Sequence, residues 1–284
     1  MGKGRIKVDF EYVSEGHSLQ TYLRWNRLPH KWCPGCGIGI VLSCYLRALK
    51  ELNIDLNKVV TVSGIGCTGR LASYVNTDGA HVLHGRAIPF AMGVKIAKPH
   101  LKVVVISGDG DLLGIGLNHL IHAARRNVEL TVIEVNNMVY AMTGGQLAPT
   151  TPRGVYTTTT PKGNVERPIN IIKILGSIKI PYLARWCVTH PRLLINSIKK
   201  ALRKEGFSFI EVISPCVEVF GRHIGIRDPV EFYLKLKEKI VIKNTSPENA
   251  ELDWNGKIIC GEFLDLELGK GYVSMITSDR RLKP

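Results

Sequence analysis

The sequence predicts an α/β fold with a doubly wound, mainly parallel sheet. Short aliphatic runs alternate with amphipathic stretches of roughly a dozen residues, the pattern of strands and helices in a parallel sheet covered on both faces. The run Val103–Ile106 is unbroken aliphatic, as expected of a strand buried on both sides. Of the 284 residues, 45% are hydrophobic and 22% are charged, which excludes a disordered chain.

The elements follow in a regular order after residues 1–30, which show no clear period and are predicted to form an N-terminal arm. Apolar residues recur at helical spacing from Gly37 to about Asn53, so a helix is expected there. A β-rich run covers Val59–Val62, and a helix over 86–97 is expected to stop before Pro99. The remaining expected strands are 101–106, 129–135, 182–186 and 207–213, the remaining helices are 114–126 and 191–204, and a Gly-, Pro- and Thr-rich loop spans 143–163.

These elements predict an α/β domain over residues 31–220 and a C-terminal extension over 221–284. A bilayer span needs about 20 consecutive apolar residues, and the sequence contains no such stretch, so we expect no membrane segment. The basic start Met1–Arg5 is not followed by the apolar core of a signal peptide. We therefore expect a cytoplasmic protein.

The charge balance favours acidic partners. Lys and Arg number 38 against 24 Asp and Glu, a formal net charge of +14. Nucleic acid, a phosphorylated cofactor or an acidic protein would each suit this charge. The sequence carries no basic-aromatic motif of a known nucleic-acid module, so we do not expect nucleic acid. Seven cysteines in a cytosolic chain of this size do not indicate a disulfide framework.

A glycine-rich turn follows the strand at 101–106. The segment Ser107–Asp111 contains Gly108 and Gly110, whose backbone amides could approach a phosphate at the start of the next helix. A dinucleotide site would need a third glycine, but Leu113 stands at that position. Asp109 between the glycines would repel a bare diphosphate, and an intervening Mg²⁺ would remove the conflict.

The next strand ends in Asn136-Asn137, at the same sheet edge if the two strands are adjacent and parallel. The amide oxygen of Asn137 could then complete a metal site beside Asp109. Gly108-Asp109-Gly110, followed after 25 residues by Asn136-Asn137, resembles the thiamine-pyrophosphate signature. The resemblance implies a sheet of the thiamine-pyrophosphate-binding type. It also implies that Asp109, Asn137 and the Val139 carbonyl hold Mg²⁺ on the pyrophosphate.

The cysteines have three interpretations. Cys33 and Cys36 could form a redox pair, or could join two further thiolates in a zinc site or an iron–sulfur cluster. Cys67 and Cys216 both lie just past predicted strand ends, at the expected ligand edge of the sheet. Cys187 also ends a strand and competes with Cys216. Four cysteines that are scattered along the sequence but expected beside a thiamine cofactor favour electron transfer over a structural metal.

Taken together, the motifs resemble the beta subunit of the 2-oxoacid:ferredoxin oxidoreductases, in particular the 2-oxoglutarate-type branch. The resemblance covers nearly the whole chain. Its segments are Cys33–Gly37, Gly64–Cys67, His84–Ala87, Gly108–Gly110, Asn118–His122, Tyr140–Gln146, Gly163–Pro168 and Gly221–Pro229.

The resemblance implies where the cofactors bind. In this family four cysteines hold one [4Fe–4S] cluster, and the matching residues are Cys33, Cys36, Cys67 and Cys216. The residues expected to line the thiamine cofactor are Ile65, Gly66, Cys67, Thr68, His84, Gly85, Gly108, Gly110, Asp111, Ala141 and Met142.

The implied reaction is the coenzyme A-dependent oxidative decarboxylation of a 2-oxoacid, 2-oxoglutarate and/or pyruvate, to acyl-CoA, with electrons passed through the cluster to ferredoxin. The implied partner is an alpha subunit, joined by gamma and delta chains in some members. The family places the activating glutamate of thiamine chemistry in another subunit, and this sequence offers no position for it. Two alternatives are a non-oxidative thiamine-dependent decarboxylase with a structural zinc and a non-catalytic assembly subunit.

Two residues are candidates for substrate contacts. Arg70, three residues after Cys67, could pair with the distal carboxylate of 2-oxoglutarate, or could be a structural arginine or contact coenzyme A phosphates. His84 could donate a hydrogen bond to the substrate or cap a turn.

Overall fold

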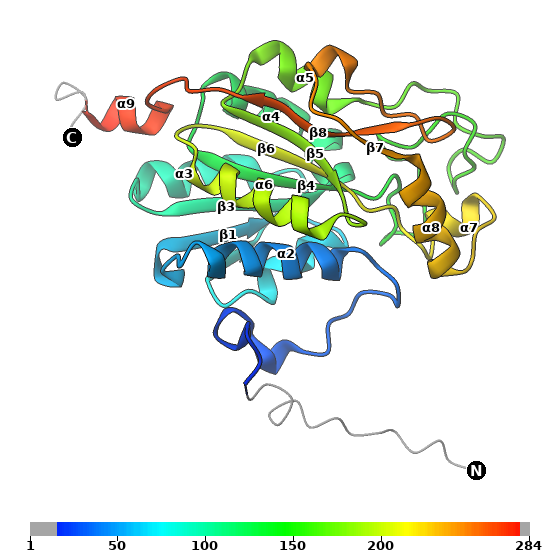
Figure 1. Cartoon of the computed structure of the whole chain (residues 1–284), viewed down its shortest axis with the longest axis horizontal. Helices are drawn as coiled ribbons and strands as arrows, with labels where there is room; N and C mark the ends of the chain where they lie inside the picture. The colour runs from blue at the N-terminus through cyan, green and yellow to red at the C-terminus, as the bar shows by residue number, and fades with distance from the viewer. Residues whose placement is uncertain (1–15, 279–284) are drawn as a thin grey trace.

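The computed structural model describes residues 16–278, in which one eight-stranded sheet is flanked by helices (Figure 1). Residues 1–15 of the predicted arm and 279–284 of the predicted extension lie outside this part. The strands are β1 (Val59–Ser63), β2 (Asp78–His81), β3 (Lys102–Gly108), β4 (Leu130–Asn136), β5 (Tyr182–Cys187), β6 (Ser208–Ile213), β7 (Ile240–Ile242) and β8 (Ile258–Asp265). The helices are α2 (Ile38–Glu51), α3 (Ala87–Ala97), α4 (Leu117–Arg125), α5 (Ile171–Ile178), α6 (Pro191–Arg203), α7 (Phe220–His223), α8 (Pro229–Lys239) and α9 (Tyr272–Ser278).

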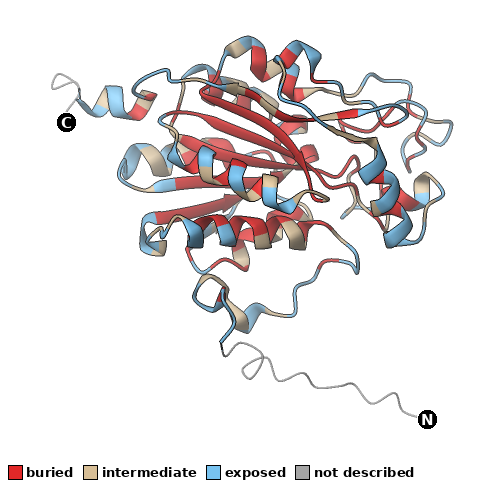
Figure 2. Cartoon of the chain, in the orientation of Figure 1, coloured by how far each residue is buried: buried red, intermediate tan, exposed pale blue. Residues whose placement is uncertain are grey.

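The sheet is doubly wound, which confirms the predicted fold class. Strands β1 to β6 pair in parallel, and α2 and α6 cover one face while α3, α4 and α5 cover the other. Strand β3 shows why its sequence is unbroken aliphatic: Val104 and Ile106 pack in one core, and Val103 and Val105 in the other. Figure 2 shows the central strands buried between the two helical layers.

The strand order indicates at which edge of the sheet a ligand site is expected. The order is β2-β1-β3-β4-β6-β5-β8-β7. Strand β2 therefore pairs on one side of β1, and β3 pairs on the other. In open α/β sheets the crevice at such a reversal, beyond the carboxyl ends of the strands, is the usual ligand site. The loops after β1, β3 and β4 all meet at this edge.

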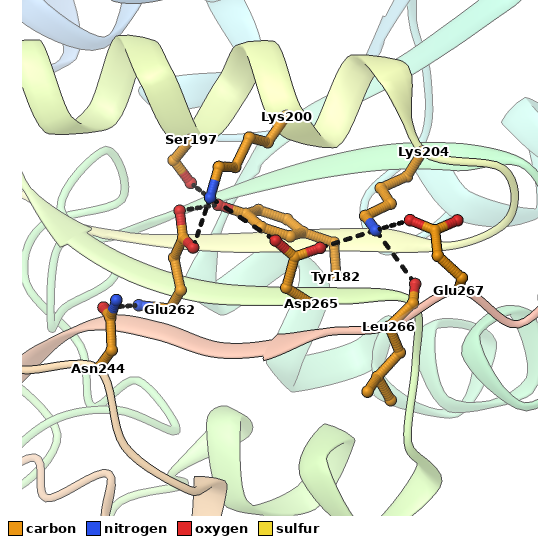
Figure 3. A network of polar contacts seen from close by, with 9 residues as sticks. All are labelled: Tyr182, Ser197, Lys200, Lys204, Asn244, Glu262, Asp265, Leu266 and Glu267. Atoms are coloured by element: carbon orange, nitrogen blue, oxygen red, sulfur yellow. Dashed lines mark hydrogen bonds and ion pairs between the residues drawn. The ribbon is translucent and has the colours of Figure 1, made fainter.

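The C-terminal strand β8 adds an antiparallel partner to β5, which periodicity did not predict. A group of polar side chains from α6 and β5 holds it in place (Figure 3). The Tyr182 hydroxyl lies 2.8 Å from Ser197 Oγ and donates to Glu262 on β8, at 3.2 Å. Lys200 on α6 lies 2.7 Å from the same Glu262 carboxylate, and Lys204 lies 2.7 Å from Asp265. Side-chain contacts therefore fix β8 to the parallel core.

The helix predicted over 114–126 consists of two pieces. A wide π-type turn covers Gly110–Ile115, Gly114 is non-helical, and the regular helix α4 starts at Leu117. Turns of this kind are frequent at functional sites. Helix α5 and the exposed edge strand β2 are further elements that the sequence analysis did not predict. No helix within residues 16–278 has the length and apolar character that a bilayer span requires.

Candidate functional site

A cavity of about 140 Å³ lies at the carboxyl ends of β1, β3 and β4. It brings together every residue predicted to line the thiamine cofactor except Gly85, together with the three predicted magnesium ligands. The lining residues are Ile65, Gly66, Cys67, Thr68, His84, Gly108, Asp109, Gly110, Asp111, Asn137, Val139, Tyr140, Ala141, Met142 and Thr143.

Asp109 is buried at the base of this cavity. Its carboxylate accepts hydrogen bonds from the Met138 amide, at 3.1 Å, and from the Thr150 hydroxyl. Burial raises the pKa of Asp109 to about 6, although these hydrogen bonds act in the opposite direction. A nearby cation would favour the ionised form. The residue therefore fits a metal ligand.

Asn137 and Val139 lie in the same cavity as Asp109, on the loop that follows β4. The Val139 amide donates to Asn137 Oδ1 at 3.2 Å. Between them Met138 has a φ of 65°, a left-handed conformation that is uncommon for a residue with a side chain. The oxygen donors that Mg²⁺ prefers are thus gathered at one place, but coordination by these residues stays a prediction.

The Asp111 carboxylate organises the cavity wall. It accepts hydrogen bonds from the Ile65 amide at 3.0 Å and the Gly85 amide at 2.7 Å, and its second oxygen accepts from Ser107 Oγ at 2.9 Å. A Cβ at Gly64 would lie 2.0 Å from Asp111 Oδ2, so only glycine fits there. Asp111 therefore joins three loops, and its polar atoms are already satisfied by the protein.

His84 lies at the mouth of the cavity. Its Nδ1 is 2.9 Å from Asp111 Oδ1, although the two atoms do not form a hydrogen bond. The side chain is 38% exposed, and the ring meets Tyr140 edge-on at 6.1 Å. The structure thus places His84 where a ligand could reach it.

Tyr140 explains one glycine of the signature in a way that the sequence analysis missed. A Cβ at Gly110 would lie 2.2 Å from the Tyr140 ring, and the Tyr140 hydroxyl donates to the Gly110 carbonyl at 2.9 Å. Gly110 is required by this packing. Tyr140 stands in a segment that carries the family resemblance, which was the available signal. Thr150, also missed, lies in the loop and gave no local signal.

A second cavity of about 270 Å³ adjoins the first. Cys33, Cys36, Cys67 and Cys216 all line it. The two cavities share four lining residues, namely Cys67, Asn137, Ala141 and Met142. A hydrogen bond from Trp32 Nε1 to the Cys67 carbonyl, at 2.7 Å, joins the Cys33–Cys36 turn to the loop after β1.

The thiols affect one another's ionisation. Burial raises the pKa of Cys36 to about 12, and the neighbouring Cys216, Cys67 and Cys33 contribute to the rise. The pKa values of Cys33 and Cys67 are also raised, mainly by burial and secondly by the neighbouring Cys216. Thiolates so close together need bound cations to be stable. Within residues 16–278, no three His, Cys, Asp or Glu side chains converge closely enough to hold a single metal ion.

Cys187, the alternative to Cys216, does not line either cavity. It is buried in the core at the end of β5, where Thr189 Oγ1 lies 3.1 Å from its sulfur. The Cys216 amide instead donates to the Asn137 carbonyl at 3.3 Å, which brings Cys216 beside the predicted magnesium loop. Arg70 lines the cysteine cavity as well, and together with Lys31 it also lines a neighbouring surface pocket.

The chain is similar to a known family model and to named proteins. The thiamine pyrophosphate enzyme C-terminal TPP-binding domain matches residues 64–212. The chain is 48% identical to the 2-oxoglutarate synthase subunit KorB of Methanocaldococcus jannaschii, over 88% of this chain and 93% of the relative. It is 36% identical to the 2-oxoacid:ferredoxin oxidoreductase subunit beta of Sulfolobus sp, over 90% and 87%.

A solved structure extends the likeness to three dimensions. The 2-oxoglutarate:ferredoxin oxidoreductase from Magnetococcus marinus, with 2-oxoglutarate, coenzyme A and succinyl-CoA bound, matches with a TM-score of 0.81 and 31% identity. The match covers 94% of this chain and 91% of that chain. The chain therefore belongs to the family of 2-oxoacid:ferredoxin oxidoreductase beta subunits.

Proposed function

We propose that this chain is the thiamine- and cluster-binding subunit of an enzyme that oxidatively decarboxylates 2-oxoglutarate with coenzyme A. The products would be succinyl-CoA and CO₂, and the electrons would pass through a [4Fe–4S] cluster to ferredoxin. One observation carries the proposal: a cavity with the Asp109 and Asn137 oxygen donors shares its wall with a cavity lined by four cysteines.

The first cavity would hold the diphosphate end of thiamine pyrophosphate. Asp109, Asn137 and the Val139 carbonyl would bind Mg²⁺, whose charge would keep Asp109 ionised despite its burial. Bound thiamine pyrophosphate supplies the electron sink for decarboxylation. Asp111 would keep the loop amides and His84 in position around it.

The second cavity would hold the cluster. A mononuclear zinc needs four sulfurs about 2.3 Å from a single point. The four cysteines instead surround a space of about 270 Å³, which favours a larger metal–sulfide group over the zinc alternative. Because Cys67 lines both cavities, the cluster would lie directly beside the cofactor, where it could accept electrons singly.

Arg70 and the size of the first cavity carry the substrate and partner assignments. Arg70 in the wall of the cysteine cavity suits a substrate with a second carboxylate, and the bound 2-oxoglutarate of the Magnetococcus marinus enzyme agrees with a dicarboxylate. The first cavity is smaller than the roughly 300–1,000 Å³ of complete ligand sites, which supports completion by an alpha subunit.

The test is anaerobic reconstitution of the chain with its alpha subunit, thiamine pyrophosphate and Mg²⁺. We expect ferredoxin reduction that requires both 2-oxoglutarate and coenzyme A, with iron and acid-labile sulfide bound to this chain. Pyruvate and 2-oxobutyrate are the comparison substrates, with Arg70→Leu beside the unmodified chain. Release of CO₂ without ferredoxin reduction, from a protein that holds zinc, would establish the non-oxidative alternative instead.

A further inference from the structure

A row of buried polar residues crosses the sheet behind the first cavity. Ser107 on β3, Glu134 on β4, Glu211 on β6 and Arg185 on β5 are register partners, so they lie side by side on one face of the sheet. All four are fully buried. Charged groups this deep in a core are costly unless they are paired, so the row requires an explanation.

Arg185 is anchored from the C-terminal part of the chain. Its Nη1 donates to the Glu251 carbonyl at 3.0 Å and the Ile259 carbonyl at 3.2 Å, and its Nη2 donates to Asn170 Oδ1 at 2.9 Å. Its Nε donates to Glu211 Oε2 at 2.6 Å. The guanidinium is therefore fixed, and it fixes the Glu211 carboxylate in turn.

The second oxygen of Glu211 faces the metal loop. Glu211 Oε1 accepts from Asn136 Nδ2 at 2.8 Å, and Asn136 Oδ1 accepts from the Met138 amide at 3.2 Å. A carboxylate can only accept and an amide N–H can only donate, so these two contacts fix the orientation of the Asn136 side chain. The same Met138 amide also donates to Asp109.

Met138 is the strained residue of this loop, with its φ of 65°. Such conformations persist only where the surroundings hold them. The contacts that hold the Met138 amide come from Asp109 on one side and from Asn136 on the other.

We propose that Glu211, anchored by Arg185, is a positioning residue that acts through Asn136 to hold the loop Asn136–Val139 in its metal-binding conformation. The chain of contacts Arg185–Glu211–Asn136, here called the polar relay, makes the C-terminal residues around Glu251 and Ile259 part of the support of the site. The inference rests on the proposed function, because it takes this loop to be the magnesium loop.

Glu134 lies next to the relay but makes no hydrogen bond to Arg185. Both of its carboxylate oxygens lack a hydrogen-bond partner among residues 16–278. Burial, followed by the neighbouring Glu211 and Asp109, raises the pKa of Glu134 well above its ordinary value, while Arg185 acts in the opposite direction. The single positive charge of Arg185 is thus matched by Glu211 at 2.6 Å.

The experiment measures, by titration calorimetry, the Mg²⁺ affinity of the reconstituted alpha–beta complex in the presence of thiamine pyrophosphate. In Glu211→Gln the amide can accept from Arg185, but it then presents N–H groups to Asn136. We expect a loss of roughly 10- to 100-fold in Mg²⁺ affinity, the usual effect of removing a residue that orients metal ligands.

The double variant Glu211→Gln/Asn136→Asp restores the contact with its direction reversed. The amide introduced at position 211 donates to the carboxylate introduced at 136, which can still accept from the Met138 amide. We expect the affinity to return to within about threefold of the unmodified complex, a difference below 1 kcal/mol. A residue that only stabilised the fold would not show this rescue.

Tyr182→Phe is the matched control, because Tyr182 is an equally buried polar residue that contacts Ser197 and Glu262 outside the relay. It should lower the thermal midpoint and leave Mg²⁺ affinity unchanged. Unchanged affinity in Glu211→Gln, or no recovery in the double variant, would overturn the inference alone. An unmodified complex that binds no thiamine pyrophosphate would overturn both the inference and the proposed function.

Discussion

Asp109 illustrates how one residue links the sequence signature to chemistry. The motif predicted a carboxylate that needs a cation, and the structure shows that carboxylate fully buried with its pKa raised to about 6 by burial. The fold thus accepts an electrostatic cost at this position. Such a cost is typical of residues retained for function.

Replacing this carboxylate should separate the two cofactors. We predict that Asp109→Asn abolishes measurable Mg²⁺-dependent binding of thiamine pyrophosphate while iron content stays the same, because Asp109 lines only the first cavity. Calorimetry measures thiamine pyrophosphate binding, and iron analysis of the same preparation measures the iron content. Asp55→Asn, which alters an exposed turn away from either cavity, is the control. Thiamine pyrophosphate affinity that survives in Asp109→Asn would remove the metal assignment.

The cysteines give a second prediction for single residues. Cys216→Ala should lose most of the bound iron, because Cys216 lines the second cavity with three other cysteines. Cys187→Ala should retain its iron, although it leaves a small gap in the core at β5. Iron and sulfide analysis after anaerobic purification decides between them. Loss of iron from Cys187→Ala with full retention in Cys216→Ala would reverse the assignment.

Among the elements, those with strong local patterns were predicted well. Strand β3 was evident because a strand buried on both faces must be apolar throughout, and α6 because its apolar residues lie on one side. Strand β2 was not predicted. Its four residues, Asp78–His81, lie at the exposed sheet edge and need no apolar pattern. Strand β8 pairs antiparallel with β5 through contacts distant in sequence, which local periodicity cannot show.

The site residues also divide into those that a local motif predicts and those that depend on contacts distant in sequence. Asp109 and Asn137 were predicted because each belongs to a short motif, and both line the first cavity. Tyr140 over Gly110, Thr150 on Asp109 and the relay through Arg185 were not found, because each depends on packing between segments far apart in the chain. Only the folded sheet brings these residues together.

The contacts that fix β8 should differ in their contribution to stability. We predict that Tyr182→Phe lowers the free energy of unfolding by about 1–2 kcal/mol, since it removes the hydrogen bond with the buried Ser197 hydroxyl and the one to the half-buried Glu262. Lys200→Ala should cost less than about 1 kcal/mol, because its ion pairs are solvent-accessible. Urea unfolding measures both. A larger loss in Lys200→Ala than in Tyr182→Phe would contradict this ranking.

At the scale of the whole molecule, the first cavity opens beside exposed apolar side chains. Leu83 is 77% exposed and Phe90 is 45% exposed, and both line a shallow groove next to Ile65 at the cavity wall. Exposed apolar groups gathered at the mouth of a site are typical of a surface that a partner covers. The small volume of the cavity fits the same interpretation.

This surface yields a prediction about assembly. We expect Leu83→Glu and Phe90→Glu each to weaken association with the alpha subunit at least tenfold, roughly 1.4 kcal/mol, because a charge would be buried there. Leu268→Glu, which alters a leucine beyond β8 that is 48% exposed, is the control. Analytical ultracentrifugation of the mixed subunits gives the affinities. Equal association in all three variants would place the alpha subunit on another surface.

The most direct test asks whether electrons pass between the two adjoining cavities. The reconstituted complex, without ferredoxin, is mixed anaerobically with 2-oxoglutarate and coenzyme A and frozen for electron paramagnetic resonance. We predict the signal of a reduced [4Fe–4S] cluster, present with Mg²⁺ and thiamine pyrophosphate and missing in Asp109→Asn. Release of CO₂ while the metal centre of this chain stays oxidised, or holds only zinc, would contradict the account.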